Sequence, residues 1–318
     1  MKIGLAGVGH LGKIHLKCLK NTKFDFIGFY DPDVILRQNL DEIGIIAFDS
    51  LESMISQVDC VDIVSPTVHH FAIAKQSIIA GKHVFIEKPL TETLEQAEEL
   101  VALSILFGVK VQVGHVERYN PAIRSLRNIN FKPKFIEGHR LAMFNPRGTD
   151  VSVVLDLMIH DLDIVLSMVK DEVTEVRANG VSIVSKTPDI CNARIEFSGG
   201  AVANLTASRI SLKNMRKLRI FQEDAYISLD FLEKEAQVVK IEENDLNEDF
   251  SGMTIHTNDG LKRIIIETPE IMKNNAIEEE LNDFYEAVVG HSEVLVTIQD
   301  GLRALSLAHI IQQKINGL

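Results

Sequence analysis

Short apolar runs alternate with helical patterns of apolar residues over roughly the first 120 residues of the chain. The runs predict strands over 2–6, 24–30, 60–64, 83–86 and 110–113, and the helical spacing predicts helices over 11–19, 51–55, 70–80 and 94–107. Strand and helix in strict alternation predict a doubly wound parallel sheet covered by helices on both faces. Ligands of such sheets bind beyond the C-terminal ends of the strands, so we look for chemistry there.

The pattern changes after Pro121, where strand-like stretches follow one another directly. We expect strands over 134–144, 172–184, 192–197, 201–208, 217–220, 225–229 and 237–241, a helix over 151–169, and closing helices over 277–289 and 298–315. Ser198, Gly199 and Gly200 predict a hairpin turn. The fold class is therefore α/β. A Rossmann domain is expected over 1–120 and an α+β domain with a large open mixed or antiparallel sheet over 121–318, its last helix free to pack back on the first domain.

The composition limits the partners of the protein. Its 318 residues agree with two domains. Lys and Arg total 33 and Asp and Glu total 45, which gives a net charge of −12. An acidic surface repels nucleic acid and anionic membranes, so we expect neither as a partner.

The apolar runs and the cysteines indicate a compartment. No apolar run approaches the roughly 20 residues of a membrane helix. The N-terminus lacks the charged and apolar regions of a signal peptide. Cys18, Cys60 and Cys191 are widely spaced and are expected to be buried apolar residues rather than a disulfide framework. We therefore expect a cytoplasmic protein.

Residues 7–12 read Gly-Val-Gly-His-Leu-Gly and connect the first strand to the first helix. In a dinucleotide-binding turn, Gly7 would allow the tight turn, Gly9 would leave room for the pyrophosphate, and Gly12 would let helix and strand pack closely. The N–H groups at the start of the helix would then face the phosphates. The alternative is a cluster of ordinary turn glycines.

The second strand ends at Asp31, about 20 residues after the glycine turn, where the dinucleotide fingerprint places an acidic residue. A carboxylate there accepts hydrogen bonds from both ribose hydroxyls of NAD and repels the 2′-phosphate of NADP. Pro32 and Asp33 follow instead of an Arg. NAD is therefore favoured over NADP, with a helix-capping role for Asp31 as the alternative.

Two further strand ends carry polar residues. Ser65, Thr67 and His70 follow the third strand, and Glu87 and Lys88 follow the fourth, just ahead of a proline. A Lys held before a rigid Pro at the cofactor-facing edge suits an active site. The alternatives are an ordinary strand-to-helix loop and a surface lysine.

The apolar helix expected over 151–169 contains Asp156, His160 and Asp163. Asp156 and His160 are four residues apart and therefore share a helix face. A carboxylate beside an imidazole favours the charged His and orients it, which suits a general base that takes an alcohol proton while hydride leaves the carbon. Lys88 would polarise the same oxygen. The alternatives are a hydrogen-bonded structural histidine and a metal site formed by His160, Asp156 and Asp163.

Together these motifs resemble the Gfo/Idh/MocA family of NAD(P)-dependent sugar and inositol dehydrogenases. The matching segments are the glycine turn with His15, Ser65-Pro66-Thr67 with His70, Gly81-Lys82-His83, Glu87-Lys88-Pro89, and Asp156-Leu157-Met158-Ile159-His160-Asp161. The resemblance implies a Rossmann domain, an open-sheet domain whose exposed face makes a homodimer or homotetramer, Lys88 as the catalytic Lys, His160 as the base and Asp156 as its orienting partner. Cofactor contacts are expected at Gly7, Gly9, His10, Leu11, Gly12, Asp31, Ser65, Thr67, His70, Glu87 and Lys88.

Residues 114–121 and 145–151 resemble more narrowly the group of UDP-N-acetylglucosamine 3-dehydrogenases, which oxidise the sugar 3-hydroxyl to a ketone. Substrate contacts are then expected at Arg118, Tyr119, Asn120, Arg140 and Arg147, because guanidinium groups bind diphosphate bidentately. Surface ion pairs are the alternative for the arginines. A dehydrogenase of a free sugar or inositol, or a non-catalytic NAD- or sugar-sensing regulator, remains open, although a sensor need not keep Lys88, Asp156 and His160.

Overall fold

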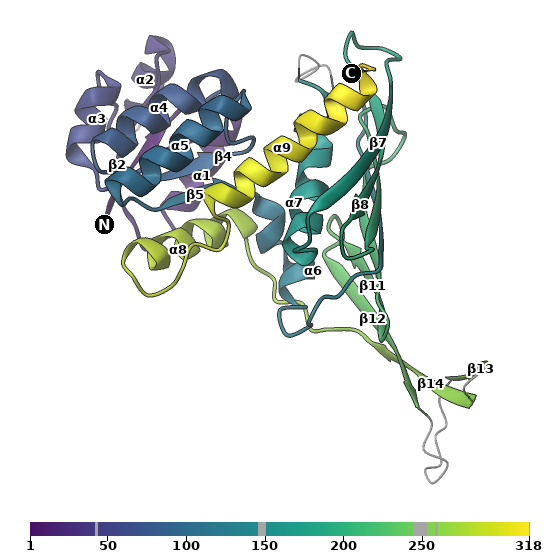
Figure 1. Ribbon diagram of the computed structural model, residues 1–318. Helices are drawn as coiled ribbons and strands as arrows, with labels where there is room; N and C mark the ends of the chain where they lie inside the picture. Colours follow the sequence, from purple (N-terminus) through teal and green to yellow (C-terminus); the bar gives the residue numbers. More distant parts are fainter. Residues whose placement is uncertain (42–43, 146–150, 244–252, 258–259, 318) are drawn as a thin grey trace. The chain divides into compact units, whose positions relative to one another are not determined.

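The computed structural model describes residues 1–41, 44–145, 151–243, 253–257 and 260–317 (Figure 1). The chain forms two compact units. The first unit comprises Met1–Tyr119 and Asn274–Ser306, and the second comprises Asn120–Lys273 and Leu307–Leu318. The chain therefore leaves the first unit one residue before the predicted boundary and later returns to it.

The first unit contains a five-stranded sheet in which every pairing is parallel. Its strands are β1 (Lys2–Ala6), β2 (Asp25–Tyr30), β3 (Cys60–Ile63), β4 (His83–Glu87) and β5 (Val111–Gly114), in the order β2-β1-β3-β4-β5. The sheet confirms the predicted Rossmann architecture. Each predicted strand is present, because a strand buried on both faces gives a continuous apolar run that is easy to recognise.

Helices cover both faces of this sheet. They are α1 (His10–Leu19), α2 (Val34–Asp41), α3 (Leu51–Gln57), α4 (Thr67–Ile79), α5 (Leu94–Phe107), the 3₁₀ turn η1 (Val116–Tyr119), α8 (Ala276–Val288) and the first part of α9 (Ile298–Ile315). Right-handed crossovers place α3, α4 and α5 on one face and α1 on the other, where α8 packs against α1. Thr93 and Gln96 form the predicted capping box at the start of α5, and Gly108 ends that helix with φ 63°.

Helix α8 explains why the chain returns to the first unit. Its apolar side chains Leu281 and Phe284 are fully buried in the core. The ring of Phe284 lies 5.9 Å from that of Phe24 and 6.0 Å from that of Phe85. The periodicity predicts this helix correctly, but it does not reveal the surface on which the apolar stripe packs.

The second unit contains a nine-stranded mixed sheet, which confirms the predicted sheet type. Its strands are β6 (Phe135–Leu141), β7 (Val173–Val181), β8 (Ile190–Phe197), β9 (Val202–Ser208), β10 (Met215–Phe221), β11 (Ala225–Asp230), β12 (Glu235–Glu243), β13 (Met253–Thr257) and β14 (Gly260–Glu267). Their order is β13-β14-β12-β11-β10-β6-β9-β8-β7, and only the β6–β9 pairing is parallel among the described strands. The last two strands along the chain, β13 and β14, were not among the predicted strands. Residues 198–200 form the predicted turn between β8 and β9, where Phe197 N–H donates to Ala201 O.

Helices α6 (Pro121–Arg124), η2 (Val154–Met158) and α7 (Ile159–Met168) pack on this sheet, together with the last part of α9. We predicted one continuous helix over 151–169. The structure instead has a π-helical turn, η2, that leads directly into α7. A π turn accommodates one extra residue without ending the helix, and such turns are frequent at functional sites. Asp156 lies within it.

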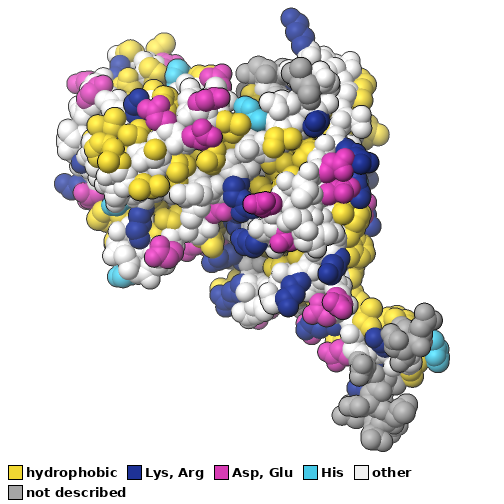
Figure 2. All heavy atoms as spheres, viewed as in Figure 1, with side chains coloured by type: hydrophobic (Ala, Val, Ile, Leu, Met, Phe, Trp, Pro, Cys, Tyr) yellow, Lys and Arg dark blue, Asp and Glu magenta, His cyan; other side chains and the backbone are white. Residues whose placement is uncertain are grey.

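The surface and core agree with two further expectations. Figure 2 shows acidic and basic side chains interspersed over the face in view. Cys18, Cys60 and Cys191 are buried free thiols, as predicted. Among the described residues, no helix is both long enough and apolar enough to cross a membrane.

Candidate active site

A pocket of about 640 Å³ opens in the first unit at the C-terminal ends of β1, β2, β3 and β4. It is lined by Ala6, Gly7, Gly9, His10, Leu11, Tyr30, Asp31, Pro32, Asp33, Leu36, Val64, Ser65, Pro66, His69, Ala72, Ile73, Glu87 and Lys88. Eight of the eleven predicted cofactor contacts are in this set. Gly12, Thr67 and His70 are the three predicted positions that do not line it.

The three turn glycines each meet a different geometric requirement. Gly7 has φ +98°, and a Cβ there would lie 2.8 Å from Ser65 N. A Cβ on Gly12 would lie 2.2 Å from Gly7 O, so only glycine lets the helix approach the turn. A Cβ on Gly9 would meet nothing within 4 Å, because this residue faces the open pocket. These residues fit a dinucleotide, since backbone N–H groups at the start of α1 can approach a pyrophosphate.

Asp31 lies at the end of β2, where it lines the pocket and also holds the glycine turn. Its Oδ2 accepts a hydrogen bond from Val8 N–H at 2.8 Å, and its Oδ1 accepts one from Asp33 N–H at 2.9 Å. A carboxylate has about four lone-pair sites, so two remain for ribose hydroxyls. The helix-capping alternative does not describe Asp31. The start of α2 is capped by Asp33 instead, because its Oδ1 accepts hydrogen bonds from Ile35 N–H and Leu36 N–H.

His70 connects the loops that follow β3 and β4. Its Nε2 lies 2.8 Å from Ser65 O, and its Nδ1 lies 3.0 Å from Pro89 O. Burial lowers the pKa of His70, against the opposite effect of these carbonyls. By contacting a carbonyl from each loop, His70 fixes the two pocket loops relative to each other. A direct cofactor contact by His70 stays a prediction.

Lys88 follows β4 directly and lines the pocket with Glu87. The peptide bond between Lys88 and Pro89 is cis. The Lys88 backbone N–H donates a hydrogen bond to Glu87 Oε2 at 3.0 Å. The main chain at Lys88, the proposed catalytic lysine, is thus held by the carboxylate of Glu87.

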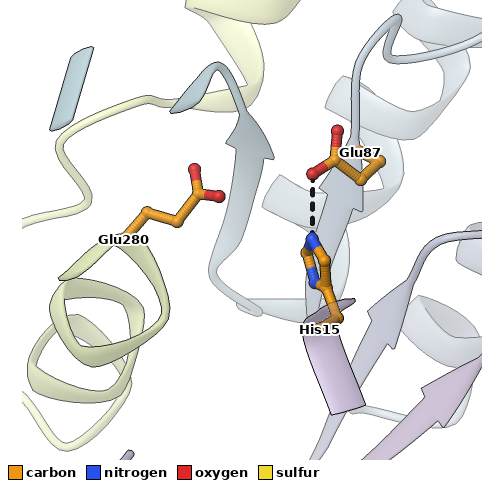
Figure 3. A group of neighbouring side chains, drawn as sticks. All are labelled: His15, Glu87 and Glu280. Atoms are coloured by element: carbon orange, nitrogen blue, oxygen red, sulfur yellow. Dashed lines mark hydrogen bonds and ion pairs between the residues drawn. The ribbon is translucent and has the colours of Figure 1, made fainter. Parts of the chain in front are cut away.

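His15 of α1 lies fully buried between two carboxylates. Its Nδ1 is 2.9 Å from Asp62 Oδ2, and its Nε2 is 3.1 Å from Glu87 Oε1. Burial acts to lower the pKa of His15, but the charge of Asp62 and hydrogen bonds to both carboxylates raise it well above its usual value. Figure 3 shows Glu280 of α8 directing its carboxyl toward the pair formed by His15 and Glu87.

The other two catalytic candidates belong to the second unit. Asp156 lies in the π-helical turn and His160 in the first turn of α7, and both are half-buried. Ser152 precedes them, and its carbonyl accepts a hydrogen bond from Asp156 N–H at 2.9 Å. The roles predicted for Asp156 and His160 stay predictions.

Arg140 of β6 forms a buried ion pair with Asp161 of α7. Its Nε lies 3.1 Å from both carboxylate oxygens of Asp161, and its Nη2 lies 2.7 Å from Oδ1. The side chains are 3% and 6% exposed. Arg140 therefore forms an ion pair, which was the alternative to substrate binding for the arginines. The pair is buried, whereas the alternative placed it at the surface. Binding of substrate by Arg140 stays a prediction.

The remaining substrate candidates lie around the start of the second unit. The Tyr119 side chain is fully buried, and its hydroxyl accepts a hydrogen bond from Gln112 Nε2 at 3.2 Å. Asn120 caps α6, and its Nδ2 donates to Phe231 O at 2.9 Å. Arg118 is half-buried. Arg147 lies outside the described residues.

Some residues that shape the site were not predicted as cofactor contacts. Tyr30, Leu36 and His69 are three that line the pocket. The strand-end rule points to Tyr30, the last residue of β2, while Leu36 belongs to α2, a helix that we did not predict. Asp62 and Glu280 gave no signal, because each is a single acidic residue within an ordinary buried element.

Comparison with known proteins agrees with this geometry. Residues 1–115 match the family described as "Oxidoreductase family, NAD-binding Rossmann fold", and residues 128–228 match the "GFO/IDH/MocA C-terminal domain". The chain is 36% identical over 310 residues to UDP-N-acetylglucosamine 3-dehydrogenase of Acidithiobacillus ferrooxidans, which covers 97% of this chain and 95% of that protein.

Solved structures give the same result. A structure of the Acidithiobacillus ferrooxidans enzyme superposes with a TM-score of 0.89 at 33% identity and covers 100% of this chain and 98% of that one. Scyllo-inositol dehydrogenase from Lactobacillus casei, with bound NAD(H) and scyllo-inositol, shares the fold with a TM-score of 0.79 at 20% identity, over 100% and 97% of the two chains. Because both units are matched, the chain belongs to the Gfo/Idh/MocA family of oxidoreductases, and its first unit is an NAD-binding Rossmann domain.

Proposed function

We propose that the protein is an NAD-dependent dehydrogenase that oxidises a secondary hydroxyl of a nucleotide sugar, with the 3-hydroxyl of UDP-N-acetylglucosamine as the first candidate. The observation that carries the substrate class is the likeness to a UDP-N-acetylglucosamine 3-dehydrogenase over nearly the full length of both chains. The alternative substrates are free inositols and sugars, since a relative that covers 66% of this chain at 30% identity is a scyllo-inositol 2-dehydrogenase of Bacillus subtilis.

The preference for NAD over NADP rests on the charges at the end of β2. The carboxylate of Asp31 lines the pocket and would repel a 2′-phosphate. The guanidinium of Arg37, a nearby cation on α2, donates to Asp49 O at 2.9 Å. The guanidinium also lies over the ring of Tyr30, 5.9 Å from its centroid, so the preference for NAD rests on the carboxylate of Asp31 and not on a lack of nearby cations.

Lys88, Asp156 and His160 carry the proposed chemistry. NAD, when bound, accepts the hydride that leaves the carbinol carbon. His160 takes the hydroxyl proton as that carbon becomes a ketone, and Asp156 orients the imidazole and stabilises its charged form. Lys88 polarises the same oxygen. The products are the keto sugar, NADH and one proton on His160, so hydride and proton both balance.

The five residues predicted to contact the substrate differ in how deeply they are buried. Tyr119, Asn120 and Arg140 are buried and bound to other protein groups, which favours a supporting role. Arg118 is half-buried, and we assign the diphosphate contact to it first. Arg147 remains a candidate from the sequence.

We also propose that the protein works in the cytoplasm as a homodimer or homotetramer assembled through the sheet of the second unit. The rings of Phe135, Phe221 and Tyr226 contact one another on this sheet in tilted pairs, with centroids 5.9 Å and 5.0 Å apart. Phe221 is 38% exposed. Exposed aromatic clusters of this kind often mark contacts between subunits.

The test is a turnover screen that follows NADH absorbance. Wild-type protein is offered UDP-N-acetylglucosamine, other UDP-sugars, free sugars and inositols, with NAD and with NADP. We expect NAD reduction with the nucleotide sugar and a fall in kcat of about 10²–10⁴-fold in Lys88→Ala and His160→Ala, with NADH binding retained.

Matched controls separate these losses from general damage. Lys75→Ala and His291→Ala remove an exposed lysine and an exposed histidine from the first unit and should keep full turnover. Full activity in both Lys88→Ala and His160→Ala would remove the catalytic assignment. Reduction of NAD by inositols alone would replace the substrate class, and cofactor binding without any turnover would favour a sensor.

A further inference from the structure

Four ionisable side chains meet in the core of the first unit, each from a different element. His15 comes from α1, Asp62 from β3, Glu87 from β4 and Glu280 from α8. Glu87 is 6% exposed and the other three are fully buried. Charged groups in such a place are costly unless they are paired, so the arrangement calls for an explanation.

The geometry assigns a positive charge to His15. Carboxylates face both of its ring nitrogens at hydrogen-bond distance, and a carboxylate oxygen accepts a hydrogen bond but does not donate one when it is ionised. The ring can satisfy both partners only if both nitrogens carry a proton. Burial raises the pKa of Asp62, against the charge and hydrogen bond of His15, which act to lower it. With Asp62 and Glu87 both ionised, His15 is an imidazolium between two anions.

The charge of His15 reaches the pocket through Glu87. One oxygen of Glu87 binds His15, and the other accepts the Lys88 backbone N–H. Burial acts to raise the pKa of Glu87, but the hydrogen bond and charge of His15, together with the charge of Lys88, lower it below its usual value. Glu87 is thus held as an anion beside the residue proposed to polarise the substrate.

Glu280 differs from Glu87 although the two carboxyl groups are close neighbours (Figure 3). Both of its carboxyl oxygens are buried and have no hydrogen-bond partner among the described residues. Burial and repulsion by Glu87 raise the pKa of Glu280 well above its usual value. Glu280 therefore carries a proton, and the cluster holds one cation, two anions and one neutral acid.

We propose that His15 and Asp62 are positioning residues of the active site. They hold Glu87 ionised and in one orientation, and Glu87 in turn fixes the main chain at Lys88. This inference rests on the catalytic role proposed for Lys88. The ionisable groups around His15 are Asp62, Glu87, Glu280 and, one turn along α1, Cys18.

The first experiment measures kcat and KM against pH for His15→Gln, Glu87→Gln and the double variant. Loss of the imidazolium leaves the Glu87 carboxylate buried without the cation of His15, so Glu87 takes up a proton. Its hydrogen bond with the Lys88 backbone N–H is then weakened. We expect kcat to fall about 10–100-fold near neutral pH, with little change in the KM for NAD. Activity of His15→Gln should recover as the pH rises, because Glu87 then ionises again.

Comparison among the variants identifies the route of the effect. Glu87→Gln should lose activity without this recovery at high pH, since an amide cannot ionise. The double variant should be no worse than Glu87→Gln alone, because His15 acts through Glu87. Glu280→Gln replaces one neutral side chain by another and should keep the wild-type pH profile. A His15→Gln profile of wild-type shape, or losses that add in the double variant, would overturn the proposal.

A second experiment needs no substrate and so stands even if the dehydrogenase proposal fails. Nitrogen NMR of ¹⁵N-histidine-labelled protein, with the His15 signals assigned from His15→Gln, should show both ring nitrogens protonated at pH 8. A neutral His15 ring would overturn the charge assignment. Elemental analysis is the companion test, because His15, Glu87 and Glu280 also lie close enough to share a metal ion. One bound zinc per chain would replace the proton network with a metal site and overturn the proposal.

Discussion

Two groups of buried charged side chains, one in each unit, are built differently. In the second unit, Arg140 and Asp161 form a pair with one charge of each sign and a bidentate contact. In the first unit, His15 must serve both Asp62 and Glu87, and Asp62 Oδ1 has no hydrogen-bond partner among the described residues. In the pair formed by Arg140 and Asp161, one positive charge matches one negative charge. In the cluster around His15, acidic side chains outnumber the single cation.

The difference indicates what each group is for. A buried ion pair can often be replaced by apolar side chains of similar volume without loss of stability. Its presence therefore does not by itself indicate a functional site. A surplus of buried acid costs free energy and is found where a site needs it. The acidic group of the first unit borders the cofactor pocket through Glu87, whereas Asp161 and Arg140 mainly join α7 to β6.

The largest expected loss of stability comes from breaking the ion pair between Arg140 and Asp161. Arg140→Met or Asp161→Leu alone should cost about 3–5 kcal/mol of unfolding free energy, because the remaining buried charge loses its bidentate ion pair. The double variant should recover most of this loss. Urea unfolding measures all three proteins.

The same double variant tests the predicted role of Arg140 in substrate binding. If Arg140 contacts the diphosphate, a stable double variant will show a raised KM for the nucleotide sugar. An unchanged KM would leave Arg140 a structural residue. Single variants that lose less than about 1 kcal/mol would contradict the description of a tightly coupled pair.

A smaller loss of stability is expected from a substitution that displaces the Glu87 side chain without changing its charge. Gly114 pairs with Glu87 across β4 and β5, and a Cβ there would lie 2.9 Å from Glu87 Cδ and Oε1. Gly114→Ala should therefore cost about 1–3 kcal/mol through overpacking and should lower kcat with it. Thermal unfolding and turnover measure the two effects. Full turnover in a destabilised Gly114→Ala would show that the orientation of Glu87 matters little.

At pH 4 the smallest change in unfolding free energy is expected from Glu280→Gln, and this change grows as the pH rises. The folded-state pKa of Glu280 lies well above its usual value of 4.5, so on raising the pH the unfolded chain loses this proton first. Stability of the wild type therefore falls from about pH 4.5 until the pH reaches the raised pKa of the folded state. Glutamine has no proton to lose and escapes this decline.

Glu280→Gln should accordingly match the wild type within about 1 kcal/mol at pH 4 and exceed it at pH 8. Urea unfolding at the two pH values gives the comparison. A variant that is less stable at pH 8 than at pH 4, relative to the wild type, would mean that Glu280 is ionised and that the surplus of acid is larger than proposed.

Local patterns in the sequence predict much of the fold. The glycine turn, the cap at Thr93 and all strands except β13 and β14 follow from rules that act over a few residues. Helix α2 (Val34–Asp41) was missed because it is short, with only eight residues. The π turn at Asp156 was missed because its extra residue leaves no mark in composition.

The site is less predictable, because its parts meet only in three dimensions. His15, Glu87 and Lys88 were singled out by the resemblance, but Asp62 is one acidic residue inside a buried strand and Glu280 one of several on an amphipathic helix. Their common location depends on the packing of α8 against α1, which no local pattern specifies. The π turn and the buried acids are thus the features that needed the structure.

Asp31 constrains how the cofactor preference of this protein could be altered by design. Its carboxylate binds Val8 N–H of the glycine turn, so the residue proposed to read the ribose also shapes the loop proposed to hold the pyrophosphate. A change of Asp31 to a smaller neutral residue, meant to admit a 2′-phosphate, would leave Val8 N–H without its acceptor. Conversion to NADP would therefore require a second substitution that restores this support, and the two changes would have to be introduced together.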